Sequence, residues 1–293
     1  MTTFPLGFFS LDALLEHKRG RTVSVCVPAH NEAATVAGVL DAVGAAHLSA
    51  FGGSGLVDEV LVVDDGSTDA TAGIASAAGA RVVRLGRRVG KGGAMRAALD
   101  AAAGELLVFL DADVQNTTGA FVTGLLGPLL VGPGDHALVK GFYERPIGDS
   151  PTGGGRVTEL VARPLLDVLF CEWPDLSLVR QPLAGETAAP RWVLEKVDFA
   201  SGYGVEIGLL VDVVTRFGPG AVAQVDLGTR VHRNRTLAEL RPQAVEVLRA
   251  ALERSEWPGR SGRPEWSGRP EWPGRPEWPD RLEWPGRPED AAQ

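Results

Sequence analysis

The chain has 293 residues, 44% of them hydrophobic, and a formal net charge of −8. This length is enough to bury one large core, or one core with a smaller appendage. The negative balance argues against general nucleic-acid binding, which needs a basic face, and two cysteines, Cys26 and Cys171, indicate neither a disulfide framework nor a zinc site. The N-terminal residues lack the basic and long apolar regions of a signal peptide, and no apolar run is long enough to span a bilayer. We therefore expect a soluble, cytoplasmic protein with no membrane or nucleic-acid partner.

Strand-like and helix-like patterns alternate from Thr22 to about Glu144. The predicted strands are Val23–Val27, Val60–Val63, Arg81–Leu85, Glu105–Leu110 and Ala137–Lys140. The predicted helices are Glu32–His47, Gly93–Ala103, Ala120–Val131 and one that follows the second strand with Ser67 or Thr68 as its N-cap. This alternation predicts an α/β fold with a mostly parallel sheet and helices on both faces.

The region from Gly153 to about Arg254 has a more helical pattern. Between Ala221 and His232 the sequence predicts either a strand pair or one extended segment. The predicted helices of this region are Val157–Phe170, Val205–Phe217 and an amphipathic segment from Thr236 to about Leu252.

The tail from about Ser255 repeats the sequence Arg-Pro-Glu-Trp-Pro-Gly with variations. Its tryptophans lie at six-residue intervals, at Trp266, Trp272, Trp278 and Trp284. Proline in every repeat is incompatible with a regular helix or a central strand. We expect a low-complexity, disordered tail, which is either a repeat expansion without function or an interaction-prone segment.

The triplet Asp111-Ala112-Asp113 follows the predicted buried strand Glu105–Leu110. Two carboxylates where a buried strand meets solvent are costly unless a cation lies beside them. Magnesium prefers one or two carboxylates together with phosphate oxygens, and open α/β sheets bind ligands beyond the carboxyl ends of their strands. The triplet therefore predicts a metal–diphosphate site, whereas a solvated turn or a helix cap explains most isolated Asp-x-Asp triplets.

Two other strand ends carry polar groups that suit a nucleoside. Pro28-Ala29-His30-Asn31-Glu32 follows the first strand and Asp64–Asp69 follows the second. Backbone groups and Glu32 near a base, with Asp65 near a ribose, would form a nucleoside pocket. Gly90-Lys91-Gly92-Gly93 opens the next helix; it is not a Walker A loop, because no Ser or Thr follows the lysine, but it suits a phosphate or uridine contact.

The segment Gly153–Thr158 precedes a predicted helix. Converging glycine N–H groups, the helix start and the charge of Arg156 predict an anion site. A flexible linker is the alternative, but it would not explain Arg156 and Thr158 at the helix start.

Further candidates for the site lie near the C-terminal end of the second region. Glu206 begins an apolar helix, where it is either a carboxylate that interacts with the helix dipole or a site residue. Arg230, His232 and Asn234 alternate along an extended segment and share one face, from which His232 could reach a metal–diphosphate group.

The strand ends resemble those of GT-A nucleotide-sugar transferases, which carry Pro-Ala-x-Asn-Glu after the first strand and Asp-Asp-Gly-Ser-Thr-Asp after the second. The second half is similar to the actinobacterial glucosyl-3-phosphoglycerate synthase family. The motifs that carry this similarity are Gly153–Leu166, Gln181–Glu186, Gly202–Leu210 and His232–Arg235. The resemblance implies a donor-binding GT-A half at 1–150, an acceptor-binding and metal-completing half at 151–254, and a Pro/Trp-rich tail at 255–293.

The resemblance also implies a reaction. It is a metal-dependent, retaining transfer of glucose from UDP-glucose to the 2-hydroxyl of 3-phosphoglycerate, which gives glucosyl-3-phosphoglycerate and UDP. The implied cofactor is Mg²⁺ or Mn²⁺, and the implied assembly is a homodimer. The alternatives are a mannosyl-3-phosphoglycerate synthase that uses GDP-mannose, a GT-A transferase with another acceptor, and a non-catalytic protein that uses the tail.

Individual residues take roles where they match the family's motifs. The resemblance assigns the nucleotide to Pro28, Ala29, His30, Glu32, Asp65 and Lys91, and the ribose and diphosphate to Asp111, Ala112 and Asp113. It assigns the metal to Asp113 and His232, and the acceptor to Gly155, Arg156, Thr158 and Asn234. Glu206 contacts the donor sugar and, with Asp113, is the expected catalytic residue, and Tyr203 and Arg230 line the same cleft. His30 and Asp65 stand where mycobacterial members carry Leu and Ser, so the sequence leaves the choice between UDP and GDP open.

Overall fold

The computed structural model describes residues 1–47, 55–132, 134–144, 146–147, 150–153, 155–231 and 236–255. His232, Asn234 and the predicted disordered tail beyond Ser255 lie outside this part of the chain. The strands of the main sheet are β1 (Thr2–Phe4), β2 (Val23–Ala29), β3 (Glu59–Asp64), β4 (Arg81–Arg84), β5 (Leu106–Phe109), β6 (Leu138–Glu144), β9 (Thr187–Pro190) and β10 (Val222–Thr229). A separate hairpin consists of β7 (Pro146–Ile147) and β8 (Ser150–Gly153).

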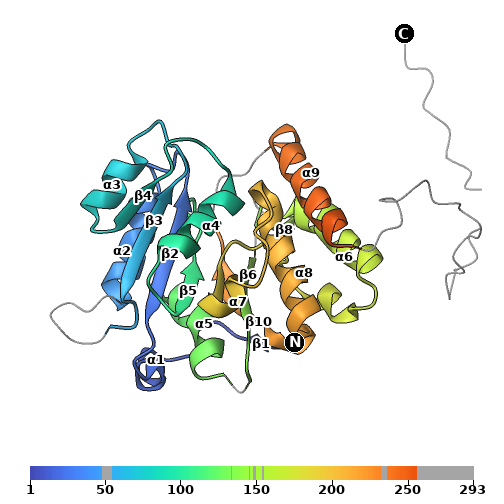
Figure 1. The fold of residues 1–293 in the computed structure, drawn as a ribbon, viewed down its shortest axis with the longest axis horizontal. Helices are drawn as coiled ribbons and strands as arrows, with labels where there is room; N and C mark the ends of the chain where they lie inside the picture. The colour runs from blue at the N-terminus through green and yellow to red at the C-terminus, as the bar shows by residue number, and fades with distance from the viewer. Residues whose placement is uncertain are drawn as a thin grey trace, which may run out of the picture. The chain divides into compact units, whose positions relative to one another are not determined.

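The α-helices flank the main sheet (Figure 1). They are α1 (Leu11–Lys18), α2 (Val36–His47), α3 (Thr71–Ala77), α4 (Lys91–Ala101), α5 (Gly119–Leu130), α6 (Arg163–Leu169), α7 (Arg191–Leu194), α8 (Val205–Phe217) and α9 (Leu237–Arg254). Short helical turns join them: the π-helical η1 (Thr158–Ala162) and the 3₁₀ turns η2 (Pro174–Leu178), η3 (Gly202–Gly204) and η4 (Pro219–Ala221). No helix in the described ranges is both long and apolar enough to cross a membrane.

The main sheet has the strand order β1-β10-β6-β9-β5-β2-β3-β4. Every neighbouring pair is parallel except those that involve β9, which runs antiparallel to both β5 and β6. The prediction of a mostly parallel sheet is therefore confirmed. Because β2, β3 and β5 run in the same direction, the polar segments that follow them emerge at one edge of the sheet.

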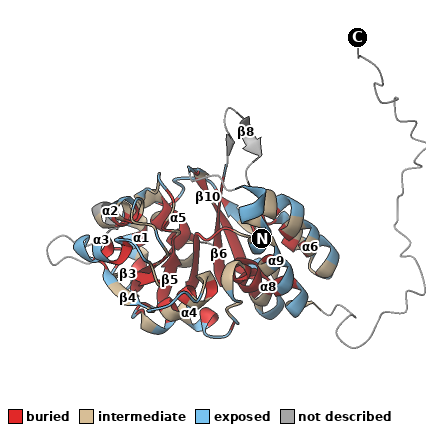
Figure 2. Cartoon of the chain, turned by 90° about the horizontal axis from the view of Figure 1, so that it is seen from above, coloured by how far each residue is buried: buried red, intermediate tan, exposed pale blue. Residues whose placement is uncertain are grey.

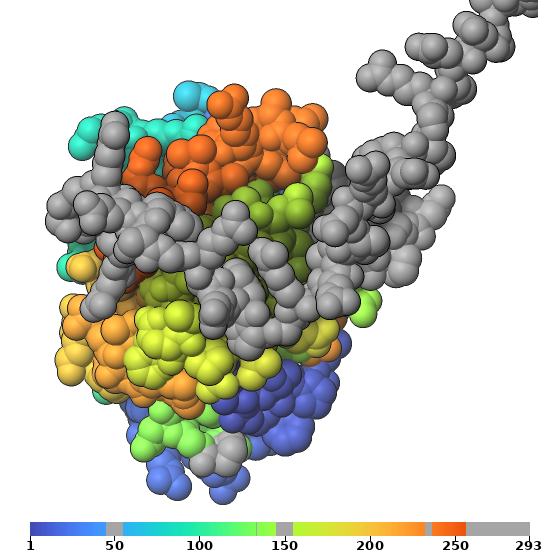
Figure 3. All heavy atoms as spheres, turned by 90° about the vertical axis from the view of Figure 1, so that its right-hand side faces the viewer, coloured from blue at the N-terminus to red at the C-terminus, as the bar shows by residue number. Residues whose placement is uncertain are grey.

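The central strands are buried on both faces, which explains their nearly continuous apolar sequences. In β5, Leu106 and Val108 join one core cluster, with α1, α2 and α5, while Leu107 and Phe109 join the other, with α4, α6, α8 and α9. Figure 2 shows the buried strands between the two helical layers. In the second layer, α9 (orange in Figure 3) lies beside the yellow-green η1–α6 segment.

Most predicted elements are present with small changes in their bounds. The helix α8 matches the predicted Val205–Phe217, and α9 begins after the predicted Thr236, whose hydroxyl and Glu239 form a capping box. The segment predicted as one helix over Val157–Phe170 begins instead with the π-helical turn η1 and continues as α6. Of the two alternatives for 221–232, the described residues form one strand, β10, which belongs to the main sheet.

The predicted N-cap at Ser67 or Thr68 is wrong. The helix α3 begins at Thr71, and Ala70 precedes it without a side-chain cap. Ser67 and Thr68 instead make hydrogen bonds to Asn31, which follows β2. Their polar groups therefore join two strand ends rather than cap a helix.

Candidate active site

A cavity of about 910 Å³ lies at the carboxyl ends of β2, β3 and β5 and extends to α9. The predicted site residues in its wall are Pro28, Ala29, His30, Glu32, Asp65, Lys91, Asp111, Ala112, Asp113 and Tyr203. The wall also includes Arg88, Gly90, Ala94, Gly202, Glu239, Pro242, Gln243 and Glu246. The structure thus brings together most of the predicted donor-binding residues, which come from distant parts of the sequence.

Hydrogen bonds tie the ends of β2 and β3 to each other. Asn31, which has a left-handed φ of 57°, donates its backbone N–H to the Ser67 hydroxyl at 3.0 Å. Its side-chain oxygen accepts the N–H of Thr68 at 2.8 Å, and the N–H of Glu32 donates to the Thr71 hydroxyl at 2.8 Å. These bonds fix the wall that the resemblance assigns to the nucleoside.

Asp65 is buried and holds the glycine-rich loop before α4. Its two carboxylate oxygens accept the backbone N–H groups of Val89, at 2.6 Å, and Gly90, at 2.9 Å. The Nδ1 atom of His30 lies 2.8 Å from the backbone oxygen of Asp65. Asp65 therefore positions Lys91, the next residue of the loop, at the start of α4.

Lys91 joins two carboxylates that approach from different elements. Its Nζ lies 2.6 Å from Asp111 Oδ1 and 2.6 Å from Glu206 Oε1. Burial alone would lower the pKa of Lys91, but these two charges raise it well above its usual value. For Asp111, burial opposes ionisation, yet the charges of Lys91 and Arg230 hold the pKa well below its usual range. Both groups are therefore ionised at neutral pH.

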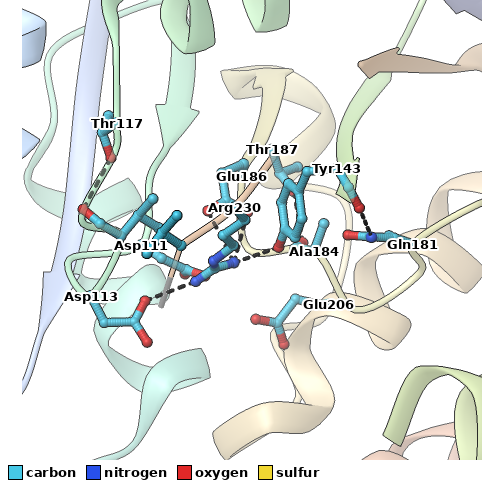
Figure 4. A network of polar contacts seen from close by, with 12 residues as sticks. Asp111, Asp113, Thr117, Tyr143, Gln181, Ala184, Glu186, Thr187, Glu206 and Arg230 are labelled. Atoms are coloured by element: carbon cyan, nitrogen blue, oxygen red, sulfur yellow. Dashed lines mark hydrogen bonds and ion pairs between the residues drawn. The ribbon is translucent and has the colours of Figure 1, made fainter. Parts of the chain in front are cut away.

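Arg230 forms the second half of the same network, which Figure 4 shows from close by. Its Nη2 lies 2.9 Å from Asp111 Oδ2 and 2.8 Å from Asp113 Oδ1, and its Nη1 lies 3.2 Å from Glu186 Oε1. Nη1 also donates to the hydroxyl of Tyr143. Burial raises the pKa of Glu186, whereas the surrounding carboxylates overcome the effect of burial and raise that of Arg230. Arg230 thus aligns Asp111 and Asp113 at the cavity wall.

Arg230, Glu206 and the predicted acceptor residues are not in the described lining of the cavity. Arg230 and Glu206 contact it through Asp111, Asp113 and Lys91. Gly155, Arg156 and Thr158 lie together at the start of η1, where Thr158 is buried. Asn234, the fourth predicted acceptor residue, lies outside the described residues.

The carboxylate side chains of this site suit a divalent ion that is bound together with a diphosphate. In the described ranges, no group of three or more His, Cys, Asp or Glu side chains could hold a metal by itself. One carboxylate oxygen of Asp113 contacts Arg230, and the side chain of Asp113 is 30% exposed. The carboxylates of the network outnumber the cations that contact them. One carboxylate plus phosphate oxygens is the arrangement that magnesium prefers. The residues present therefore fit the predicted metal.

Several residues of this site carry no role predicted from the sequence, among them Glu186, Tyr143 and Glu246. Glu186 lies in the Gln181–Glu186 motif that supports the resemblance, so the sequence carries a signal for it. Tyr143 and Glu246 lie within a regular strand and a regular helix, and their sequence context gives no such signal.

The sheet, the cavity at its carboxyl edge and the carboxylate–cation network define a glycosyltransferase of the GT-A type. In agreement, the family model described as Glycosyl transferase family 2 matches residues 24–154. Glucosyl-3-phosphoglycerate synthase from Mycolicibacterium paratuberculosis is 49% identical over 251 residues, which cover 81% of this chain and 73% of the relative. The synthase from Petrotoga mobilis is 40% identical over 257 residues, with 84% and 77% covered. The chain belongs to the glucosyl-3-phosphoglycerate synthase family.

Solved structures agree with this assignment. The Mycobacterium tuberculosis synthase in complex with Mn²⁺, UDP-glucose and phosphoglyceric acid has a TM-score of 0.77 and 45% identity, with 87% of each chain covered. The same enzyme with Mg²⁺ and UDP has a TM-score of 0.77 and 46% identity, with 87% of this chain and 86% of that chain covered. These structures hold either metal together with the nucleotide.

Proposed function

We propose that this chain transfers glucose from UDP-glucose to the 2-hydroxyl of 3-phosphoglycerate, with retention at the anomeric carbon, to give glucosyl-3-phosphoglycerate and UDP. The observation that carries the proposal is the network in which Lys91 and Arg230 hold Asp111, Asp113 and Glu206 beside the cavity. One relative with this fold, the Mycobacterium tuberculosis synthase, was solved with UDP-glucose and phosphoglyceric acid, and with UDP and glucosyl-3-phosphoglycerate. Mannosyl transfer from GDP-mannose is the second candidate, because His30 and Asp65 depart from the mycobacterial pattern.

The donor occupies the cavity in this proposal. Pro28, Ala29, His30, Glu32 and Asp65 face the nucleoside, and their hydrogen-bonded turns supply a rigid wall. Lys91 lies where the nucleoside wall meets the carboxylate network, so its charge serves the diphosphate. Asp111 and Ala112 lie at the ribose and diphosphate, with Tyr203 and Arg230 on the same side.

Asp113 and His232 would hold the metal in this proposal. A bound divalent ion supplies Lewis-acid stabilisation of the charge that builds on the leaving diphosphate. Arg230 keeps one oxygen of Asp113 occupied at 2.8 Å and so orients the carboxylate before any ligand binds. Preorganised charges of this kind stabilise the transition state without a reorganisation cost.

The acceptor carries a phosphate and a carboxylate, so it needs a local positive site in an acidic chain. Gly155, Arg156 and Thr158 at the start of η1 supply backbone N–H groups, a guanidinium and a hydroxyl. Asn234 completes this acceptor set in the proposal. The acceptor's 2-oxygen forms the new bond to the anomeric carbon, the bond to the diphosphate breaks with its electron pair leaving on UDP, and the hydroxyl proton is released.

The proposed reaction is tested by release of the nucleoside diphosphate, UDP or GDP, from each donor with 3-phosphoglycerate and MgCl₂. Acceptor-dependent release from UDP-glucose, but not from GDP-glucose or GDP-mannose, is the expected result. Release from GDP-mannose alone would show that the chain transfers mannose instead of glucose. No acceptor-dependent release from any of these donors would overturn the proposal, and a β-linked product, identified by NMR, would overturn retention.

We further propose a homodimer that acts in the cytoplasm, where a transferase would meet both substrates. The helix α9 supports the dimer, because Val245, Leu248 and Leu252 form a second apolar stripe opposite its buried Val247 and Ala251. Light scattering should give twice the chain mass, and Leu248→Glu should give a monomer. A wild-type monomer at micromolar concentration would contradict the proposed assembly.

A further inference from the structure

Lys140 is a buried cation behind the active site. It lies in β6, between Thr187 of β9 and Gln224 of β10, and is only 2% exposed. Its ammonium donates to the backbone oxygen of Ala184 at 2.5 Å. A buried ammonium is costly, and an apolar side chain of similar length would fill the same space at lower cost. The bond to Ala184 is therefore the feature that needs an explanation.

Residues 184–186 form a bend that is anchored at both ends by β6. Lys140 holds the backbone oxygen of Ala184, and the N–H of Gly141 donates to the backbone oxygen of Glu186 at 2.8 Å. Figure 4 shows Glu186 beside Arg230, with which it forms an ion pair. Two adjacent residues of one strand thus set the position of Gly185.

Gly185 packs directly on the ion pair between Lys91 and Asp111. A Cβ atom at this position would lie 2.1 Å from Asp111 Oδ1 and 2.4 Å from Lys91 Nζ. A side chain here would fit only if the side chain of Asp111 or Lys91 moved, so a shift of this segment toward the ion pair would displace the pair. The backbone of Gly185 therefore helps to hold the side chains of Lys91 and Asp111 in place.

We infer that Lys140 is a positioning residue for donor binding, which holds Gly185 against the Lys91–Asp111 pair through the oxygen of Ala184. This inference rests on the proposed function, in which the Lys91–Asp111 pair binds the nucleotide sugar. It assigns Lys140 no contact with either substrate. The predicted defect is in donor binding, with the acceptor site at η1 left intact.

The test measures UDP-glucose binding to the full chain by isothermal titration calorimetry in MgCl₂, for the wild type and for Lys140→Met. Lys18→Met is the matched control, since Lys18 is also buried and donates to a backbone oxygen, that of Gly55 at 2.8 Å, but lies away from the cavity. Loss of a group that orients the site should weaken UDP-glucose binding by about 10- to 100-fold in Lys140→Met. Lys18→Met should bind like the wild type, and in turnover assays the KM for 3-phosphoglycerate should stay unchanged in both variants.

Gly185→Ala provides an independent variant if Lys140→Met does not fold. Its added methyl group should displace the same ion pair and cause a similar loss of UDP-glucose binding. Wild-type affinity in a folded Lys140→Met, or in Gly185→Ala if Lys140→Met does not fold, would overturn the inference while leaving the proposed function intact. A wild-type chain that does not bind UDP-glucose would overturn both.

Discussion

The carboxylate of Glu246 accepts the backbone N–H of Tyr203 at 2.7 Å, across 43 positions of the chain. This bond connects α9 to the turn η3, which precedes Glu206. Gly202 makes the contact possible, because it has a φ of +58° and a Cβ there would lie 2.2 Å from Glu246 Oε2. The helix α9 therefore fixes one wall of the cavity.

Two replacements of Glu246 should distinguish the effect of this hydrogen bond on activity from the effect of side-chain packing. Glu246→Ala removes the acceptor for Tyr203 and should lower kcat/KM for UDP-glucose about tenfold, the effect expected for one hydrogen bond to a charged group. Glu246→Gln keeps an acceptor oxygen and should retain most of the activity. Glu253→Ala, at an exposed position of the same helix, is the control. Equal losses in the Ala and Gln variants would contradict a role for the hydrogen bond.

Asp113→Asn should abolish metal-dependent turnover while keeping the shape of the site. The amide oxygen can still accept from Arg230, which lies 2.8 Å from Asp113 in the wild type, but the negative charge is lost. Mn²⁺ binding in the presence of UDP, measured by electron paramagnetic resonance, should weaken in parallel. Asp100→Asn, at an exposed position, should bind Mn²⁺ normally. Normal Mn²⁺ affinity in Asp113→Asn would show that this carboxylate is not a ligand.

Arg156→Ala should weaken acceptor binding rather than donor binding. A guanidinium that binds phosphate or carboxylate contributes charge-assisted hydrogen bonds, so the KM for 3-phosphoglycerate should rise about tenfold or more. The KM for UDP-glucose should change little, as should both constants in the surface control Arg96→Ala. A near-normal KM for 3-phosphoglycerate would remove Arg156 from the acceptor site.

The parts of the fold that sequence predicts are those with a periodic pattern of their own. The strands β2, β3 and β5 are nearly continuous apolar runs, and the polar segments after them line the cavity. In contrast, β9 has only the four residues Thr187–Pro190 and takes its antiparallel place from pairing with β5 and β6. Such pairing depends on partners far along the chain, which no local pattern records.

The same distinction holds within the active site. Asp111, Asp113 and Lys91 follow strand ends or open a helix, where polar residues are conspicuous. The contact of Arg230 with Glu186 and the support of Gly185 by Lys140 depend on how β6, β9 and β10 pair. Lys140 occupies a predicted strand, yet only the tertiary structure shows that its ammonium is buried.

The two cysteines should differ sharply in reactivity. Cys26 lies in β2 without exposure to solvent, and burial raises the pKa of its thiol to about 12, whereas Cys171 is exposed. Since the thiolate is the nucleophile, only Cys171 should react with Ellman's reagent at pH 8 in the folded protein. Cys171→Ser should then give no fast reaction, and both thiols of the wild type should react after denaturation. Two fast-reacting thiols in the native chain would contradict the burial of Cys26.

The burial of Lys140 also predicts a pH dependence of stability. Burial lowers the pKa of its ammonium to about 8 from the usual 10.5, although the charge of Glu206 opposes the shift. Between pH 8 and 10.5 the unfolded chain therefore binds a proton that the folded chain does not, so this group makes the free energy of unfolding rise with pH in that range. Below pH 8 both states are protonated, and the cost of burying the charge is fully present.

Lys140→Met should remove this contribution. At pH 7.5 the variant should be at least as stable as the wild type in urea unfolding, since a buried charge has been replaced by an apolar side chain. From pH 8 to 10.5 the free energy of unfolding of the wild type should rise, relative to that of the variant, by on the order of 3 kcal/mol, because each pKa unit corresponds to about 1.4 kcal/mol. Lys18→Met serves as the control for the titration of the other ionisable groups, which the wild type and Lys140→Met have in common. Parallel pH profiles for the wild type and Lys140→Met would mean that Lys140 stays charged in the folded chain throughout this range.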